Sequence, residues 1–453
     1  MPRLIPALWR RNALCLLPLA LLVAAPAWAL DLRQAYAAAL THDATIRAAR
    51  ASTAAAHERL PQARAQRLPQ ISLSAARNYN DLTSTTAEST GRSRRFHNDY
   101  YSDNQSLNLR LPLYRPALGA QVLQAQAQVE DANALLERDE QALVVRVGEA
   151  YFDALLARDQ VALLQAQKAS HISLLDAARK SFAVGAGTST DIDEAQARLD
   201  LTLAQELEVQ QHVEFTERRL EVLTGLSAAS LAPLDVARFA PQPPQPRMDD
   251  WIARAEHASP ELQALRAQGE AARLEVSKAE AGHQPTLDAV ASVSRSHSDN
   301  VTSVNTRYAQ KTLGLQLSIP LYSGGAVNSQ VRQALASQER AGEALESARR
   351  ELGVRVHQEF RSMAEGVLRI RALEQAVRSA QQALLSNQKS LQAGSRTTLD
   401  VLQAEQQKTT ALRDLAQARY RYLLAQLRLQ SLAGDDRQES IQQANAWLRT
   451  SIP

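Results

Sequence analysis

An internal repeat constrains the fold of this chain more than any other feature of its sequence. Four segments of the first half recur in the second half, in the same order and 208 or 209 positions further on. The matching pairs are 107–114 with 315–322, 180–185 with 389–394, Asp191 with Asp400, and 223–225 with 432–434. Chance similarity would not preserve both order and spacing, so the sequence predicts two structural repeats, 30–232 and 249–434.

The segments outside the repeats are a leader, a linker and a tail. Residues 1–29 have the features of a secretory signal peptide, because three arginines precede an apolar run that ends in a small-residue cleavage site, Ala27-Trp28-Ala29. A linker at 233–248 contains five prolines, which favour a stiff, extended chain. Residues 435–453 are expected to form a polar C-terminal tail. We therefore expect a protein that leaves the cytoplasm.

Composition excludes several classes of protein. Cys15 is the only cysteine and lies in the predicted signal, so the mature chain has no disulfide and no thiolate site. Three of the 51 Lys and Arg residues also lie there, which leaves 48 basic against 48 acidic residues and no bias toward nucleic acid. The motifs H-E-x-x-H, G-x-S-x-G and G-x-x-x-x-G-K are absent, so we expect no enzyme, no metal site and no cofactor.

Each repeat is predicted to have the same order of elements. A first helix is followed by two short strands, an unbroken helix of nearly 70 residues, a Gly-containing turn and a last helix. The predicted helices are 31–66, 117–184 and 191–224 in the first repeat and 249–283, 325–393 and 399–432 in the second. At about 1.5 Å per residue the longest helices measure about 100 Å, which predicts a rod. A soluble coiled coil would share this helical pattern.

The predicted strands distinguish the two possibilities. Residues 311–322 alternate strictly between apolar and polar side chains, 107–113 repeat the pattern, and 71–75 and 287–293 show it more weakly. Strands of about 9–11 residues span a bilayer when tilted, and this alternation suits lipid on one side and water on the other. A half-buried soluble sheet would give the same period, but the leader, the repeat and the rods favour a membrane barrel.

Four strands are too few to close such a barrel. The smallest membrane barrels have about eight strands, and an open edge in lipid leaves backbone groups unpaired. Two chains would give a barrel whose interior is filled by side chains, whereas three would give twelve strands and leave room for a pore. The sequence therefore predicts an oligomer and favours a trimer.

These features together resemble the TolC family of outer-membrane efflux and secretion proteins over essentially the whole mature chain. The resemblance is carried by the two-repeat plan, by the strand endings Leu111-Pro112-Leu113-Tyr114 and Ile319-Pro320-Leu321-Tyr322, and most specifically by the turn Ala393-Gly394-Ser395-Arg396-Thr397-Thr398-Leu399-Asp400. It implies a mainly α fold with membrane β structure. In this fold, three protomers share a twelve-stranded β-barrel in the cell outer membrane, continued by a long α-helical barrel in the periplasm. Tyr114 and Tyr322, with Pro112 and Pro320, would mark the membrane interface, where aromatic side chains gather.

The resemblance also implies a closed periplasmic aperture at the two turns. By position, Arg396 is the gating arginine, Thr190 and Asp191 are its partners, and Asp400 belongs to an acidic ring. Gln403 stands where the family often has a second Asp, which implies a weaker ring. Gly185 and Gly394 are expected to serve the turns themselves. From the residues alone, Asp191 and Asp400 could instead cap helix starts.

The function implied is that of an exit duct. A periplasmic adaptor and an inner-membrane transporter, either an ABC protein or a proton-driven pump, would recruit and open it, and outer-membrane lipid would surround the barrel. We favour type I secretion of a protein such as a toxin or protease, because the lipoprotein signal of many drug-efflux members is absent. The alternatives are the outer-membrane component of a multidrug efflux pump and, from another class, a periplasmic coiled-coil adaptor.

Overall fold

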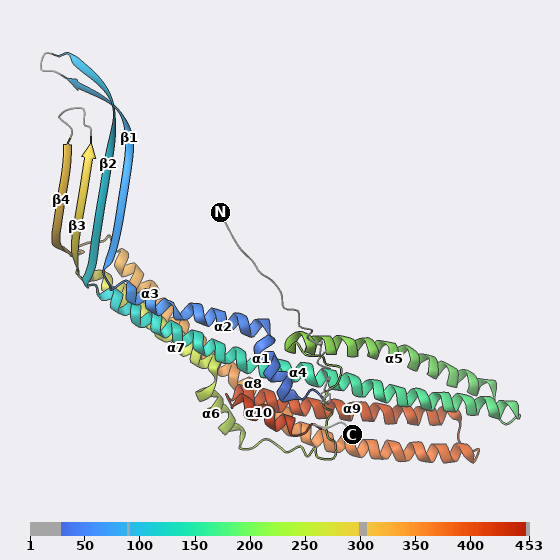
Figure 1. Ribbon diagram of the computed structural model, residues 1–453. Helices are drawn as coiled ribbons and strands as arrows, with labels where there is room; N and C mark the ends of the chain where they lie inside the picture. Colours follow the sequence, from blue (N-terminus) through green and yellow to red (C-terminus); the bar gives the residue numbers. More distant parts are fainter. Residues whose placement is uncertain (1–28, 88–90, 299–305, 450–453) are drawn as a thin grey trace, which may run out of the picture.

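The computed structural model describes residues 29–87, 91–298 and 306–449 of the 453-residue chain. The predicted signal peptide lies outside these residues except for Ala29. Figure 1 shows an elongated molecule in which a four-stranded sheet stands at one end of a long helical rod and is bent away from its axis. This shape agrees with the rod that the sequence predicts.

The four helices of the outer part of the rod follow the predicted ranges within two residues. They are α4 (Pro116–Ala183), α5 (Ser189–Thr224), α8 (Ala326–Gln392) and α9 (Thr398–Leu432). The 68 residues of α4 and the 67 of α8 each give a length of about 100 Å. Pro116 occupies the first turn of α4, where its missing N–H removes no helical hydrogen bond.

The prediction of one continuous first helix in each repeat is wrong. Residues 31–66 form three helices, α1 (Leu32–His42), α2 (Ala44–His57) and α3 (Arg59–Ala65). The first break lies at Asp43, whose carboxylate accepts the backbone N–H of Thr45 at 2.7 Å and so starts a new helix.

The equivalent region of the second repeat breaks at a proline. Residues 249–283 form α6 (Met248–Ala258), α7 (Pro260–Glu280) and the short 3₁₀ helix η1 (Ala281–His283). The break follows from Pro260, which begins α7 and cannot donate the hydrogen bond that would continue α6.

Helices of both repeats pack along α4. The half of α4 near the sheet contacts α2, α3 and α7, whereas its far half contacts α5 and α9 (Figure 1). Helix α8 lies against α7 near the sheet and against α9 beyond it. The shorter helices thus follow one another along the two long ones, as the predicted lengths require.

The main apolar core lies at the middle of the rod. It includes the fully buried side chains of Leu143, Tyr151 and Leu427. The Tyr151 hydroxyl lies within hydrogen-bonding distance of the backbone carbonyls of Leu30 (2.9 Å) and Ala232 (3.0 Å) and can donate its one hydrogen to either. It thus brings both ends of the first repeat against α4. The core therefore holds the mid-rod region together while both ends of the molecule project from it.

The C-terminal segment belongs to this core, although the sequence suggested a polar tail. Helix α10 (Arg437–Asn445) packs against α1 and α9, with Ile441 and Ala444 buried. Beyond it, Leu448 forms an isolated bridge with Leu234 of the Pro-rich linker. Only two apolar side chains of α10 are buried, so the apolar spacing is too short to predict a packed helix from this polar sequence.

The sheet is fully antiparallel, with the order β1-β2-β3-β4. Its strands are β1 (Gln70–Ala87), β2 (Ser93–Tyr114), β3 (Thr286–Ser298) and β4 (Thr306–Ser318). They contain 18, 22, 13 and 13 residues, so the predicted length of about 9–11 is too short. The prediction followed the apolar alternation, whereas the strands continue into polar sequence beyond it.

None of the helices within the described ranges is both long enough and apolar enough to cross a membrane.

Candidate functional site: the helix turns and the sheet edges

Two matched turns close the end of the rod farthest from the sheet. Gly185 follows α4 and Gly394 follows α8, with φ values of 73° and 72° in the left-handed region that favours glycine. The next residues, Ala186 and Ser395, each donate a backbone N–H at 2.9 Å to a carbonyl five residues earlier. Both turns thus end their long helix with the same Schellman-type hydrogen bond.

Asp191 and Asp400 each cap the helix that follows its turn. The Asp191 carboxylate accepts the backbone N–H of Thr188 at 3.0 Å and its hydroxyl at 2.7 Å. Asp400 makes the same contacts with Thr397, both at 2.9 Å. These hydrogen bonds lower the pKa of both carboxyl groups, so both are ionised at neutral pH. The capping role that the sequence left open is therefore present in this structure.

Arg396 pairs within its own turn. Its guanidinium lies 3.3 Å from the Asp400 carboxylate, and both side chains are partly exposed to solvent. Thr398 of this turn lies close enough to the Asp191 carboxylate of the other turn to help lower its pKa. Thr190 and Gln403 are exposed. Of the predicted gate residues, the structure therefore brings Arg396 and Asp400 together.

Two threonines of this site, Thr188 and Thr397, were not among the predicted site residues. Thr188 and Thr397 occupy the N-cap positions, three residues before Asp191 and Asp400. The pattern Thr-x-x-Asp at a helix start is a capping-box signature, so the signal was present in the sequence.

Polar contacts rather than a large apolar core join the helices in the outer half of the rod. Gln167 of α4 donates to Gln406 of α9 at 2.8 Å, and His171 of α4 lies 3.0 Å from the Thr202 hydroxyl of α5. A small apolar cluster supplements them. It comprises Leu384, Val401 and Ala404, with Leu174 and Leu391 against them. Helix pairs joined in this way can separate at a lower cost than pairs that bury a continuous apolar seam.

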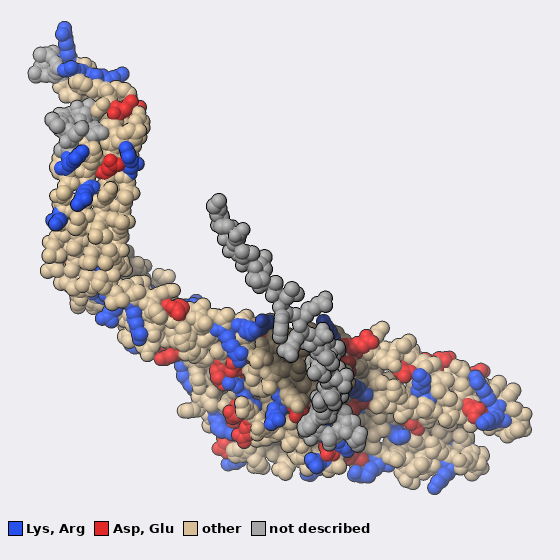
Figure 2. All heavy atoms as spheres, viewed as in Figure 1, with Lys and Arg blue, Asp and Glu red and all other residues tan. Residues whose placement is uncertain are grey.

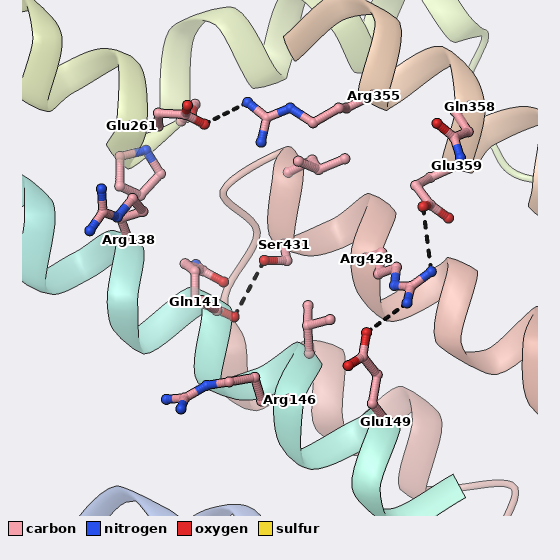
Figure 3. A pocket seen from close by; sticks show the side chains of 15 residues that line it. Arg138, Gln141, Arg146, Glu149, Glu261, Arg355, Gln358, Glu359, Arg428 and Ser431 are labelled. Carbon is pink, nitrogen blue, oxygen red and sulfur yellow. Dashed lines mark hydrogen bonds and ion pairs between the residues drawn. The ribbon is translucent and has the colours of Figure 1, made fainter. Parts of the chain in front are cut away.

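A cavity of about 530 Å³ lies among α4, α7, α8 and α9 near the middle of the rod (Figure 3). Arg428 crosses it, 2.6 Å from Glu149 and 3.7 Å from Glu359, and burial raises the pKa of Glu359. Arg355 and Glu261 pair at 2.6 Å on another wall. Two other lining arginines, Arg138 and Arg146, pair with Asp139 and Asp43 outside the lining. Ion pairs thus occupy the charges of this cavity, which is a joint between helices.

A second ion cluster joins the sheet to the rod. Asp288 at the base of β3 is buried, and its carboxylate accepts hydrogen bonds from Arg110 of β2 and Arg115 at 2.6–3.0 Å. Arg115 is the residue immediately before α4. One carboxylate thus fixes two strands and the start of the longest helix relative to one another.

The predicted interface residues differ in their surroundings. Pro112 lies within β2 at a register shift, and Tyr114 ends that strand. By contrast, β4 ends at Ser318, so Tyr322 is not at a strand end as predicted; it lies four residues further on and is 90% exposed. Neither proline can donate a backbone hydrogen bond to the sheet. The irregular register at Pro112 tolerates this within β2, whereas β4 ends before Pro320.

Both sheet edges are open within the described residues, and the two faces differ chemically. Side chains at odd positions, including Leu73, Leu109 and Leu315, share one face, and polar residues such as Asn108 share the other. Figure 2 shows that the part of the sheet nearest the rod has no Lys, Arg, Asp or Glu on its visible face. Further strands paired to β1 and β4 would satisfy the backbone groups of both open edges.

The rod, the two-faced sheet and the paired turns define the class of outer-membrane channel protomers. A solved structure of this architecture is the outer membrane protein VceC from Vibrio cholerae. It matches with a TM-score of 0.74 at 22% sequence identity, covering 89% of this chain and 96% of that chain, which shows the shared fold. The chain belongs to the outer membrane efflux protein family, whose model matches residues 35–226 and 251–435.

Two relatives resemble the chain over most of its length. The alkaline protease secretion protein AprF of Pseudomonas aeruginosa is 35% identical, covering 91% of this chain and 86% of that protein. The outer membrane protein TolC of Escherichia coli is 32% identical, covering 89% of this chain and 82% of that protein. The predicted TolC-family membership is thus confirmed. The chain is an outer-membrane export channel rather than an enzyme or a periplasmic adaptor.

Proposed function

We propose that three copies of this chain form one duct, with a shared twelve-stranded barrel in the outer membrane and the helices lying in the periplasm. The open edges of β1 and β4 carry this proposal. In lipid, each unpaired backbone group would cost several kcal/mol. Pairing β1 of one protomer with β4 of the next removes both edges, and twelve strands leave a pore.

The duct serves type I secretion in this proposal, passing a protein such as a protease or toxin. The name of the relative AprF, an alkaline protease secretion protein, supports this use. An inner-membrane ABC transporter would supply the energy, because the chain has no nucleotide-binding motif, and a periplasmic adaptor would connect the two. Multidrug efflux with a proton-driven pump is the second candidate, favoured by the efflux description of the family.

Complementation distinguishes these two uses. The chain is expressed in a strain that lacks its own duct but keeps an ABC transporter and adaptor for a secreted protease. Secreted protease activity with unchanged drug sensitivity supports secretion. Restored drug resistance without secreted protease contradicts it and supports the efflux alternative.

We also propose that the two turns form the periplasmic gate. Three copies would bring the ionised carboxylates of Asp191 and Asp400 around one axis, which favours cations. Arg396 would restrain the turn through Asp400 and, in the trimer, reach Thr190 and Asp191 of a neighbour, while Gln403 adds no charge.

Single-channel recording in a planar bilayer tests the gate. Asp400→Asn keeps an oxygen for the cap but removes the charge, so we expect a lower cation preference and easier opening. Asp414→Ala, on α9 away from the turn, is the control and should behave as the wild type. Identical selectivity in wild type and Asp400→Asn would remove the gate assignment and leave the duct.

A further inference from the structure

The sheet ends in a two-stranded ribbon at the tip farthest from the rod (Figure 1). We call residues 79–87 of β1 and 93–101 of β2 the distal ribbon. Pairing of β2 with β3 begins only at Ser102, so within the described residues no third strand supports the distal ribbon. Isolated two-stranded ribbons are marginally stable in water. A contact that links its two strands would therefore stabilise this segment.

The register places like charges opposite each other in this ribbon. Asp81 pairs directly with Asp99, and like charges in that position destabilise a sheet. Lower on the same two strands the pairing is complementary, because Arg77 stands opposite Asp103 with their charged atoms 3.6 Å apart. The acid pair at Asp81 and Asp99 is thus a local conflict that a cation would relieve.

An imidazole completes the cluster. His97 lies on the same face, with Nδ1 3.2 Å from the Asp81 carboxylate and Nε2 3.6 Å from that of Asp99. One ligand atom from each of the three residues lies within 4.8 Å of the other two. The three side chains are 47–62% exposed, so their torsions can rotate to bring these atoms to the spacing of a first coordination shell.

We propose that Asp81, His97 and Asp99 bind a divalent transition-metal cation such as Zn²⁺ on the distal ribbon. One imidazole and two carboxylates are ligands that Zn²⁺, Cu²⁺ and Ni²⁺ accept, and three protein ligands leave positions for water. Because Asp81 belongs to β1 and the other two to β2, the bound cation clamps the two strands together.

No sequence motif indicates this site, and we expected no metal. Its ligands come from two strands and are brought together only by the register of the hairpin, so they form no motif of fixed spacing. The alternative is a cluster without a metal, in which the His97 imidazole only contacts the two carboxylates.

Metal titration of the purified, detergent-extracted protein separates these cases. After treatment with a chelator, Zn²⁺ is added in competition with a fluorescent zinc indicator. We expect about one strong site per chain, and His97→Ala and Asp99→Asn should each weaken it at least about tenfold. His297→Ala is the matched control, because that histidine lies on β3, outside the distal ribbon, with its Nδ1 3.9 Å from the Asp103 carboxylate. Equal binding by wild type and His97→Ala would overturn the proposal.

Hydrogen exchange provides a second readout that does not depend on other zinc sites. Zn²⁺ should slow amide exchange in the distal ribbon of the wild type and leave the ribbon of His97→Ala unchanged. Copper bound at this site should also show nitrogen coupling from one imidazole in electron paramagnetic resonance. Exchange that is insensitive to Zn²⁺ in the wild type would reduce the cluster to an ion pair.

Discussion

At the scale of single residues, the turns at the end of the rod do two things at once. Asp191 and Asp400 accept the backbone N–H groups of the N-cap residues Thr188 and Thr397, and their charges remain on the surface of the turn. The sequence placed both acids in the correct turns. It could not show which partners they take, because the choice between Thr397, Arg396 and a neighbouring turn depends on side-chain geometry.

Loss of a cap should destabilise the turn measurably. Thr397→Ala removes the hydroxyl that accepts the Asp400 N–H, and such a loss costs about 1 kcal/mol. Thermal unfolding should therefore shift to lower temperature. Thr410→Ala, inside α9, is the control and should not destabilise, because alanine is the better helix former. An unchanged unfolding temperature in Thr397→Ala would show that the cap contributes nothing to stability.

A buried histidine should make the outer rod sensitive to acid. Burial lowers the pKa of His171, so the folded chain keeps it neutral. Below a pH of about 6.5 the unfolded chain binds a proton at this histidine that the folded chain does not bind. The free energy of unfolding therefore decreases as the pH is lowered. His171→Gln should lose this component and show a shallower fall of unfolding temperature between about pH 6.5 and 5. Parallel curves for the two proteins would contradict this.

At the scale of elements, the sequence predicted best what is long and regular. The bounds of α4 and α8 follow within one residue from the repeat and from the turns containing Gly185 and Gly394. The breaks at Asp43 and Pro260 were missed, because apolar spacing continues across both while local hydrogen bonding changes. The full lengths of the strands were missed for a related reason. Their outer parts pair through backbone hydrogen bonds, which do not depend on an apolar side-chain pattern.

The joint between sheet and rod depends on one carboxylate. Asp288→Asn leaves Arg110 and Arg115 without their anionic partner, and we expect the free energy of unfolding to fall by about 2 kcal/mol. This loss is smaller than for a fully buried pair, because both arginines are partly exposed. Ser292→Asn, on the same face of β3, is the control. The measurement is thermal unfolding in detergent. Equal unfolding temperatures for Asp288→Asn and the control would show that the ion cluster around Asp288 does not stabilise the fold.

At the scale of the whole molecule, the open edges predict where neighbouring protomers meet. Ser74 on β1 and Thr312, Gly314 and Gln316 on β4 share the polar face of the sheet. Cysteine at Ser74 should form a disulfide with cysteine at one of these three positions in the next chain. Since Cys15 is the only cysteine of the sequence and lies in the predicted signal peptide, oxidation of the introduced cysteines should give covalent dimers and trimers on a denaturing gel.

The same gel contains its own control. Cysteine at Ser292 on β3, whose two sides are already paired, should give no ladder with Ser74→Cys. Covalent products larger than a trimer, or none from any of the three pairs, would contradict a closed ring of three.

The sheet of one protomer also has a genetic consequence. Its wall is incomplete by itself, so in the proposed trimer every chain supplies one edge to each neighbour, and a single faulty edge opens the ring. A variant damaged at β1 or β4 would then be dominant over a coexpressed wild-type chain, because most mixed assemblies would contain it. A variant damaged only within the mid-rod core would misfold before assembly and remain recessive.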